Sequence, residues 1–397
     1  MKYKALVFCL AYFLGFMLMH GQKKESTEPT DNIRAKMIEL IKEKEYENAI
    51  QLGKQAFKID NTLTDSLAMA KSLYLISRTY ALAGDFENSV EYGEKGASLS
   101  MSLEDYPLEY KINNTLSWAY YMVGKDFSES LKHQERQINL VNQLDDPGAK
   151  ALVYNNYGYD TTVSGTLPLV ESIEYMKFAN DYYANQEGND GRWYTLMNLT
   201  WQHRLKGDLQ KSEYFGRLAV NQAEKDKDRH AIIEANTNLG ETLIAQNKLK
   251  VAKPFYEDAL KWSQEKKDRD KYVFDVYYGR YLWELGERDK AIQIIEEAVE
   301  FLKTSEIFYE MLGRAYLANF YFSNNDLESA MAEIEAIENP RSDNVSFETR
   351  FISAIAEYNI LMKKNRVTEA ENYLKPYLVK ANEIGAKHLF KLKDKNS

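Results

Sequence analysis

Residues 236–259 read NTNLGETLIAQNKLKVAKPFYEDA, and this stretch decides the fold. Asn247 stands near its middle, and asparagine tolerates the left-handed backbone conformation that ends many helices. The apolar Leu249 follows two residues later, so one helix is predicted to end at Asn247 and a second to begin near Leu249. Ala252 and Ala259 then lie two turns apart on one face of the second helix, where their small side chains let the two helices approach closely.

The same pattern recurs at an almost constant spacing along the chain. Small residues take the position of Ala252 at intervals of 39–42 residues, namely Ala49, Ser89, Ser130, Ser172, Ser212, Ala252, Ala291, Ala330 and Ala370. Six of these nine anchors have Gly or Asn five residues earlier, and eight have an apolar residue three residues earlier. A single helical hairpin cannot bury its own apolar face, so neighbouring hairpins must stack. The sequence therefore predicts nine stacked hairpins over residues 31–384.

Composition excludes several other classes of protein. The 397 residues include 19 Gly and 7 Pro, too few for the many turns of a β-sandwich or barrel. A hydrophobic share of 44% is enough for a core and excludes a mainly disordered chain. The formal charge of −9 disfavours nucleic acid as a partner. The length allows two or three domains or one extended array, and the repeat favours the array.

The repeated segments resemble tetratricopeptide repeats (TPR) of an exported bacterial protein, in a long-period variety of about 40 residues like that of kinesin light chains and some bacterial peptide receptors. The positions that match the family's spacing best are Gly240, Leu243, Leu249, Ala252, Tyr256 and Ala259. The resemblance implies an all-α fold, an α-solenoid or right-handed superhelix of about nine TPR-like helical hairpins. The fourth hairpin departs from the family, with an expanded turn expected over Thr161–Pro168.

The resemblance also implies which side chains face the concave groove of the superhelix. They flank the small residue in the first helix of each hairpin or lie one turn further along that helix. Transferred along the chain, these positions are Tyr74, Arg78, Asn155, Tyr159, Met197, Trp201, Arg204, Thr237, Glu241, Arg280, Trp283, Asn319 and Phe322. Tyr, Trp and Arg anchor interfaces, so this set has the composition of a binding surface. The alternative is that about half of these side chains simply pack between repeats.

The first residues are predicted to be a targeting sequence. Lys2 and Lys4 precede the apolar run Ala5–Met19, which is short for a bilayer span and typical of a secretory signal peptide. We expect a signal peptide over residues 1–21 and a flexible lead over 22–30, with an uncleaved N-terminal anchor as the alternative. Export to the periplasm or the extracellular space follows, with no membrane span after signal removal. Residues 385–397 are expected to be a basic C-terminal tail.

Searches for catalytic or metal-binding motifs return little. The one cysteine, Cys9, lies in the signal, and no two histidines have the spacing of a helical zinc pair. No phosphate-binding or dinucleotide-binding glycine loop is present. We therefore expect no catalytic residues, no metal and no cofactor. TPR clamps for a peptide's C-terminal carboxylate use Lys and Asn on adjacent first helices, and the matching positions here hold no such pair.

The sequence thus favours a non-catalytic scaffold that binds a protein or an extended peptide in the concave groove. Two alternatives stay open. The chain could be a stand-alone sensor or regulatory repeat module of a signalling system, acting through a separate membrane partner. It could also be a glycan-binding envelope protein, because sugar sites often present exposed Trp and Tyr side chains.

Overall fold

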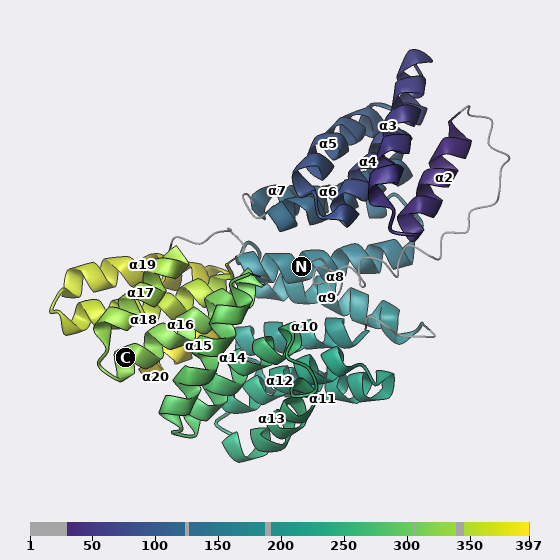
Figure 1. The fold of residues 1–397 in the computed structure, drawn as a ribbon. Helices are drawn as coiled ribbons and strands as arrows, with labels where there is room; N and C mark the ends of the chain where they lie inside the picture. The colour runs from purple at the N-terminus through teal and green to yellow at the C-terminus, as the bar shows by residue number, and fades with distance from the viewer. Residues whose placement is uncertain (1–29, 124–126, 187–191, 305, 339–344, 397) are drawn as a thin grey trace. The chain divides into compact units, whose positions relative to one another are not determined.

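The computed structural model describes residues 30–123, 127–186, 192–304, 306–338 and 345–396. This part of the chain forms nineteen α-helices and no strand (Figure 1). The predicted signal peptide, and the lead apart from Thr30, lie outside the described residues. Among the helices described, none has the length and apolar character needed to cross a membrane.

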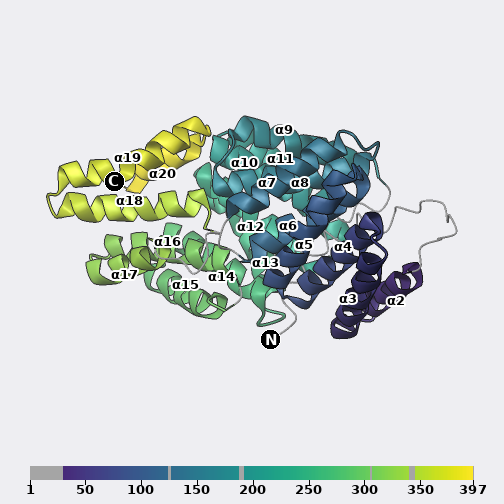
Figure 2. The ribbon, with the colours of Figure 1, turned by 90° about the horizontal axis from the view of Figure 1, so that it is seen from above.

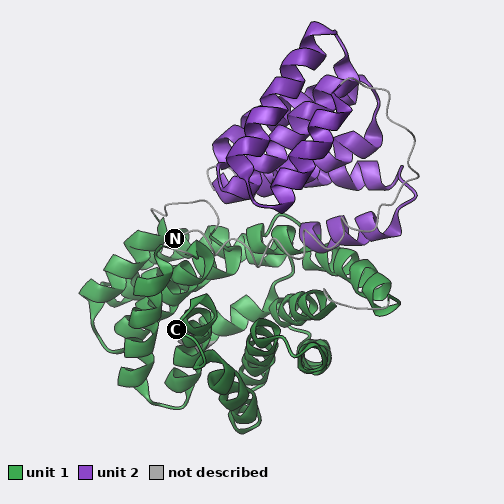
Figure 3. Ribbon diagram, turned by 45° about the vertical axis from the view of Figure 1, so that its right-hand side comes forward, with its two compact units in different colours: residues 1–11, 158–397 green, residues 12–157 purple. Residues whose placement is uncertain are grey.

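The described residues fall into two compact units, 30–157 and 158–396 (purple and green in Figure 3). The N-terminal unit contains α2 (Asp31–Lys42), α3 (Tyr46–Thr62), α4 (Ser66–Ala83), α5 (Phe86–Ser102), α6 (Tyr106–Val123), α7 (Phe127–Val141) and the first part of α8 (Pro147–Ser164). Its core is a cluster of apolar side chains from α2 to α6, in which Met37, Ile76 and Leu116 are fully buried.

The C-terminal unit continues from α8 and holds the remaining helices. These are α9 (Leu169–Ala184), α10 (Arg192–Lys206), α11 (Leu209–Asp226), α12 (Arg229–Ala245), α13 (Leu249–Ser263), α14 (Arg269–Glu284), α15 (Arg288–Leu302), α16 (Ile307–Ser323), α17 (Leu327–Glu338), α18 (Phe347–Lys363), α19 (Val367–Glu383) and α20 (Lys387–Asn396). The first helices of successive hairpins, α10, α12, α14, α16 and α18, contact one another in turn and form one continuous layer.

The prediction of nine hairpins is confirmed. Eight pairs of consecutive helices between α2 and α19 pack together, and in the ninth pair Thr161 of α8 lies 3.0 Å from Ser172 of α9, measured between hydroxyl oxygens. The second helix of each hairpin begins three residues before its small anchor. None of the nine anchors has any exposed surface. Ala252, for example, lies three residues inside α13, where a larger side chain would have no room against α12. The fold is therefore the all-α solenoid that the period predicted.

The turns within the hairpins follow the predicted chemistry. The residue five places before the anchor has a positive φ in seven of the eight hairpins where the structure describes it, at Lys44, Gly84, Gly207, Asn247, Gly286, Asn325 and Asn365. Glycine and asparagine reach this region at little cost. Lys44 adopts it too, with φ 62°, so a residue that sequence reasoning does not single out takes the same role.

The fourth hairpin corrects one expectation. The turn is shorter than Thr161–Pro168, because α8 continues through Ser164 and the chain turns only at Gly165, whose φ is 68°. The hydroxyl groups of Thr162 and Ser164 donate to the carbonyl oxygens of Gly158 and Asp160, at 2.7 and 2.8 Å. These polar side chains therefore bond within the helix instead of opening it.

The basic segment after residue 384 is helical over most of its length. Within α20, Leu389 is fully buried and His388 nearly so. The helix packs against α18 and α19 and also against α10 (Figure 2). Residues from the predicted C-terminal tail thus belong to the core of the C-terminal unit.

Candidate ligand-binding site

One contact joins distant parts of the C-terminal unit. The indole Nε1–H of Trp201 on α10 donates to Oε2 of Glu348 on α18 at 2.7 Å, and Arg204 Nη1 donates to Oε1 of the same carboxylate at 3.2 Å. Both helices are first helices of their hairpins, the fifth and the ninth. A second contact runs from the backbone N–H of Leu169 to the carbonyl oxygen of Ile384, at 2.8 Å. The row of first helices therefore bends until its fifth and ninth members meet.

A cavity of about 420 Å³ lies beside this contact. It is lined by side chains of α10, α14, α16, α18 and α20 and by the first residue of α15, namely Arg204, Arg280, Trp283, Glu284, Arg288, Tyr316, Asn319, Phe320, Ser323, Glu348, Ile352, Ile355 and Leu392. Four of these, Arg204, Arg280, Trp283 and Asn319, belong to the groove set expected from the sequence. The cavity is thus built mainly by first helices, on the side of the array where the groove was expected.

Two of the three arginines of the cavity, Arg204 and Arg280, are held by buried carboxylates. Arg280 donates to Oε2 of Glu241, whose Oε1 accepts a hydrogen bond of 2.7 Å from the hydroxyl of Tyr256. The guanidinium of Arg280 also lies 5.6 Å from the centre of the Tyr316 ring. Burial lowers the pKa of Arg204, but the adjacent Glu348 carboxylate outweighs this and the net shift is upward. Both guanidinium groups are therefore fixed in position as permanent cations.

Aromatic rings form a second part of the wall. The rings of Trp283 and Phe320 stack with their centres 3.9 Å apart, and the Arg288 guanidinium lies 5.1 Å from the Trp283 ring centre. Trp201 is 8% exposed and contributes its N–H to Glu348. Neither tryptophan presents an open ring face of the kind on which a sugar would stack.

The remaining residues of the predicted groove set lie elsewhere. Tyr159 packs against Trp201, with 5.9 Å between ring centres. Thr237 is buried and donates to the carbonyl oxygen of Ile233. Met197 is 8% exposed, and Phe322 is half-buried with the Lys363 ammonium 5.7 Å from its ring. The structure thus places these side chains within or beside the packing between helices.

Three predicted groove residues belong to the N-terminal unit. Arg78 donates to the hydroxyl of Tyr74 at 3.3 Å, so the two are neighbours on α4. Asn155 on α8 is buried and donates to the side-chain oxygen of Asn156 at 3.4 Å. They are no part of the cavity described above.

Sequence reasoning missed several lining residues, among them Glu348, Ile352 and Leu392. The transfer of family positions stopped at the eighth hairpin, so the first helix of the ninth was not included. One more step of the period would have placed that helix over residues 347–363, with Glu348 as a carboxylate in its first turn. Leu392 was missed because its segment was taken for a tail.

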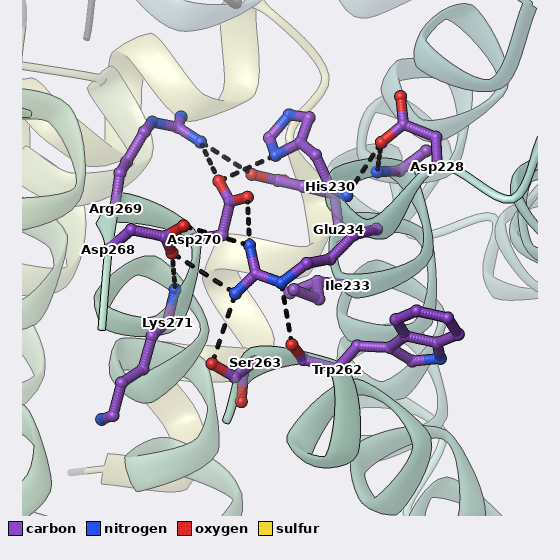
Figure 4. Close-up of polar contacts among 12 residues, drawn as sticks. Asp228, His230, Ile233, Glu234, Trp262, Ser263, Asp268, Arg269, Asp270 and Lys271 are labelled. Atoms are coloured by element: carbon purple, nitrogen blue, oxygen red, sulfur yellow. Dashed lines mark hydrogen bonds and ion pairs between the residues drawn. The ribbon is translucent and has the colours of Figure 1, made fainter. Parts of the chain in front are cut away.

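A second group of charged residues lies where the first helices of neighbouring hairpins begin (Figure 4). Arg229 donates to Asp268 and Asp270, at 3.3 and 2.9 Å, and His230 Nδ1 lies 3.0 Å from Asp270. Arg269 donates to Glu306 at 2.7 Å. Arg229 thus binds the N-terminal end of the next hairpin's first helix, and Arg269 does the same one repeat later. We call this group the inter-repeat clamp.

The clamp shifts the pKa values of its members. Burial lowers the pKa of His230, but its hydrogen bond to Asp270 and the charges of Glu234 and Asp270 outweigh burial, so the net shift is upward. Burial raises the pKa of Asp270, but His230, Arg269 and Arg229 outweigh it and bring the value to about 2. All of these groups face a partner of opposite charge, which is the arrangement of a structural ion network. No group of three His, Cys, Asp or Glu side chains suited to a metal ion occurs among the residues described.

Comparisons with known proteins agree with this architecture. A family model described as the MalT-like TPR region matches residues 185–389, just over half of the chain. No curated protein matches the sequence.

Several solved structures share the fold. Aspartyl phosphate phosphatase F from Bacillus subtilis superimposes with a TM-score of 0.54 at 15% identity, covering 92% of this chain and 97% of its own. NprR in complex with its cognate peptide NprX gives a TM-score of 0.60 at 11% identity, covering 90% and 100%. The Rap conjugation gene regulator of plasmid pLS20, in complex with the Phr* peptide, gives 0.58 at 14%, covering 89% and 95%. At these identities the likeness concerns the helical repeat fold.

Proposed function

The chain belongs to the MalT-like TPR region family, and from this premise we propose that it is a non-catalytic scaffold that binds a peptide in the cavity of its C-terminal unit. The observation that carries the proposal is the convergence of Arg204, Arg280, Trp283 and Asn319 on one cavity of about 420 Å³. Pockets that bind small ligands commonly measure about 300–1,000 Å³ and combine apolar walls with a few fixed polar groups.

The cavity measures about 420 Å³, the size of a pocket for a small ligand. We therefore propose that it takes the end of an extended peptide. Two proteins with the same fold, NprR and the Rap regulator of pLS20, are described in complex with peptides, and this supports the choice of a peptide.

A binding role also suits the chemistry of the cavity better than catalysis. Glu348 is bonded to both Trp201 and Arg204, and Arg280 is bonded to Glu241. Carboxylates engaged in this way are poor general bases, because a base must be free to take a proton. A glycan-binding role has less support, since the rings of Trp201 and Trp283 are covered.

We further propose that the protein works outside the cytoplasm, in the periplasm or the extracellular space. The support is the basic start and apolar run of residues 1–21. The same cavity would serve a stand-alone sensor module that passes its signal to a membrane partner. N-terminal sequencing of the protein from the envelope and the medium tests whether the signal peptide is cleaved. The expected result is an N-terminus near residue 22.

Photo-crosslinking tests the binding site. A photoreactive amino acid at Ser323, an exposed residue of the cavity wall, is expected to capture peptides from an envelope extract. The control is the same amino acid at Tyr214, which is 60% exposed and lies on α11, the second helix of the fifth hairpin. Equal capture at both positions, or none at Ser323, would contradict the proposal.

A further inference from the structure

We propose that the cavity recognises a carboxylate group of the peptide, bound by Arg204, Arg280 and Arg288. This inference rests on the proposed function, because it names the chemistry by which the same cavity would select its peptide. The carboxylate is either the free C-terminus or an acidic side chain. The apolar part of the wall favours the C-terminus, since a C-terminal residue presents a carboxylate and a side chain together.

The balance of charge in the lining is the first argument. Its charged side chains are three arginines and two glutamates. Glu348 is already engaged by Trp201 and Arg204, and it is only 9% exposed. The lining itself therefore carries one more arginine than glutamate, while Arg280 is paired with Glu241 behind it. Arginine is suited to this task because its planar fork of N–H groups matches the two oxygens of a carboxylate.

Arg204 supplies the second argument. Its side chain is 6% exposed, and only Nη1 is seen to donate to Glu348. Its Nε–H is buried and has no hydrogen-bond acceptor among the residues described. A buried donor without an acceptor is costly, because it has lost its bond to water. A ligand oxygen that reaches this N–H would relieve the cost, so the free protein is prepared for an acceptor at this point.

Arg288 supplies the third argument. It is exposed at the first position of α15, at the edge of the cavity. Among the described residues it has no ion pair, and its guanidinium rests on the ring of Trp283. An arginine placed in this way keeps its N–H edge available while the ring fixes its plane. Arg288 is thus the cation that a ligand meets first.

The apolar lining residues complete the ligand's description. Ile352, Ile355 and Leu392 give part of the cavity wall an apolar surface. Burial of one such contact favours a ligand side chain such as Leu, Ile or Phe next to the carboxylate. The sequence analysis rejected a Lys/Asn carboxylate clamp, and the three arginines are a different solution to the same chemical task.

Three pools of random synthetic pentapeptides test the proposal. One pool has free C-termini and lacks Asp and Glu, the second is its C-amidated counterpart, and the third is C-amidated but contains Asp and Glu. The immobilised mature chain is exposed to each pool, and retained peptides are quantified by mass spectrometry. Arg288→Gln and Arg280→Gln are compared with Arg217→Gln, a control that removes an exposed arginine of α11. Circular dichroism verifies that each variant folds, and Arg288→Gln serves alone if the buried Arg280 cannot be replaced.

We expect the wild-type chain and the Arg217→Gln control to retain peptides from the first pool, the third, or both, but not from the second. Retention of the first pool identifies a C-terminal carboxylate, and retention of the third identifies a side-chain carboxylate. Arg288→Gln should weaken retention about ten- to a hundredfold, the usual worth of a charged hydrogen bond. Equal retention of all three pools, or retention that the variants leave unchanged, overturns the carboxylate while leaving peptide binding intact. If no pool is retained, the proposed function itself fails.

Discussion

Trp201 and Glu348 are 147 residues apart in the sequence, yet the indole N–H of one lies 2.7 Å from a carboxylate oxygen of the other. The same carboxylate accepts a hydrogen bond from Arg204, so a single acidic side chain fixes the meeting of α10 and α18. Trp201, Arg204 and Glu348 are each at least nine-tenths buried, and the cavity lies beside them.

Glu348→Gln is expected to lower the free energy of unfolding by about 3–5 kcal/mol, the usual effect of removing one partner of a buried ion pair. The reason is that Arg204 would stay buried as an unpaired cation. Urea titrations measure the loss. The control is Glu369→Gln, whose exposed pair with Arg366 should be worth about 0–1 kcal/mol. A similar small change in both variants would contradict the role given to Glu348.

Gly279→Ala is expected to destabilise the protein by about 1–3 kcal/mol, the range for an overpacked core. A Cβ at this position would lie 2.4 Å from Cγ1 of Ile295 and 3.0 Å from the carbonyl oxygen of Ala291. Gly96→Ala is the matched control, because its Cβ would come no closer than 3.3 Å to any neighbour. Thermal unfolding of the two variants compares them, and an equal shift would count against close helix contact at Gly279.

His203 is expected to make the protein sensitive to acid. Burial lowers its pKa to about 4, although Asp208, 3.8 Å from Nδ1, opposes the shift. Between about pH 6.5 and pH 4 the unfolded chain therefore binds a proton that the folded chain does not. The free energy of unfolding thus decreases as the pH is lowered through this range. From about pH 7 to 4.5 the wild type should lose about 2–3 kcal/mol more than His203→Gln. Parallel pH profiles of the two proteins would rule this out.

His230 is expected to act in the opposite sense. Its pKa is raised in the folded state, so its contribution to stability is complete below about pH 6.5 and is lost as pH rises through the folded value. Asp270→Asn removes the negative charge of its hydrogen-bond partner, and the pKa of His230 should then fall. NMR titration of the ring protons measures this. The variant should lose about 1–3 kcal/mol at about pH 5 and less at about pH 9; a loss independent of pH would show that the ion pair with His230 is unimportant.

Leu389→Ala is expected to cost about 2–5 kcal/mol, because Leu389 is fully buried where α20 packs in the C-terminal unit. Lys391→Ala, an exposed position of the same helix, should change stability by less than about 0.5 kcal/mol. Chemical denaturation of the two variants gives the comparison. If residues 387–396 were only a tail, neither substitution would matter.

The register of the hairpins could be predicted because it is a local property of the chain. Asn247, Leu249 and Ala252 lie within six residues, and each takes part in the turn or the packing that its type favours. The period then extended this one hairpin to all nine. The prediction of an expanded turn at Thr161–Pro168 was wrong for a local reason as well, because the hydroxyl groups of Thr162 and Ser164 bond to carbonyl oxygens inside the helix.

The site could be predicted only in part. Arg204, Arg280, Trp283 and Asn319 line the cavity because their positions in the first helices set the direction of their side chains. Whether they bind a ligand stays a prediction. The period could place Glu348 in the first helix of the ninth hairpin, but not its contact with Trp201 and Arg204, because no repeat pattern states how strongly a row of helices bends. That bend depends on many small contacts between hairpins, and it alone decides that the fifth hairpin meets the ninth.

The bond between Trp201 and Glu348 also bears on how the C-terminal unit unfolds. Linear repeat arrays fray from their termini, because a terminal repeat has only one neighbour to lose. Here α10 is held by α18 and α20, and the start of α9 by Ile384, so the two ends of the unit are joined to each other. Its repeats should exchange their amide hydrogens at similar rates and melt as one cooperative block, and loss of Glu348 should restore the stepwise behaviour of an ordinary array.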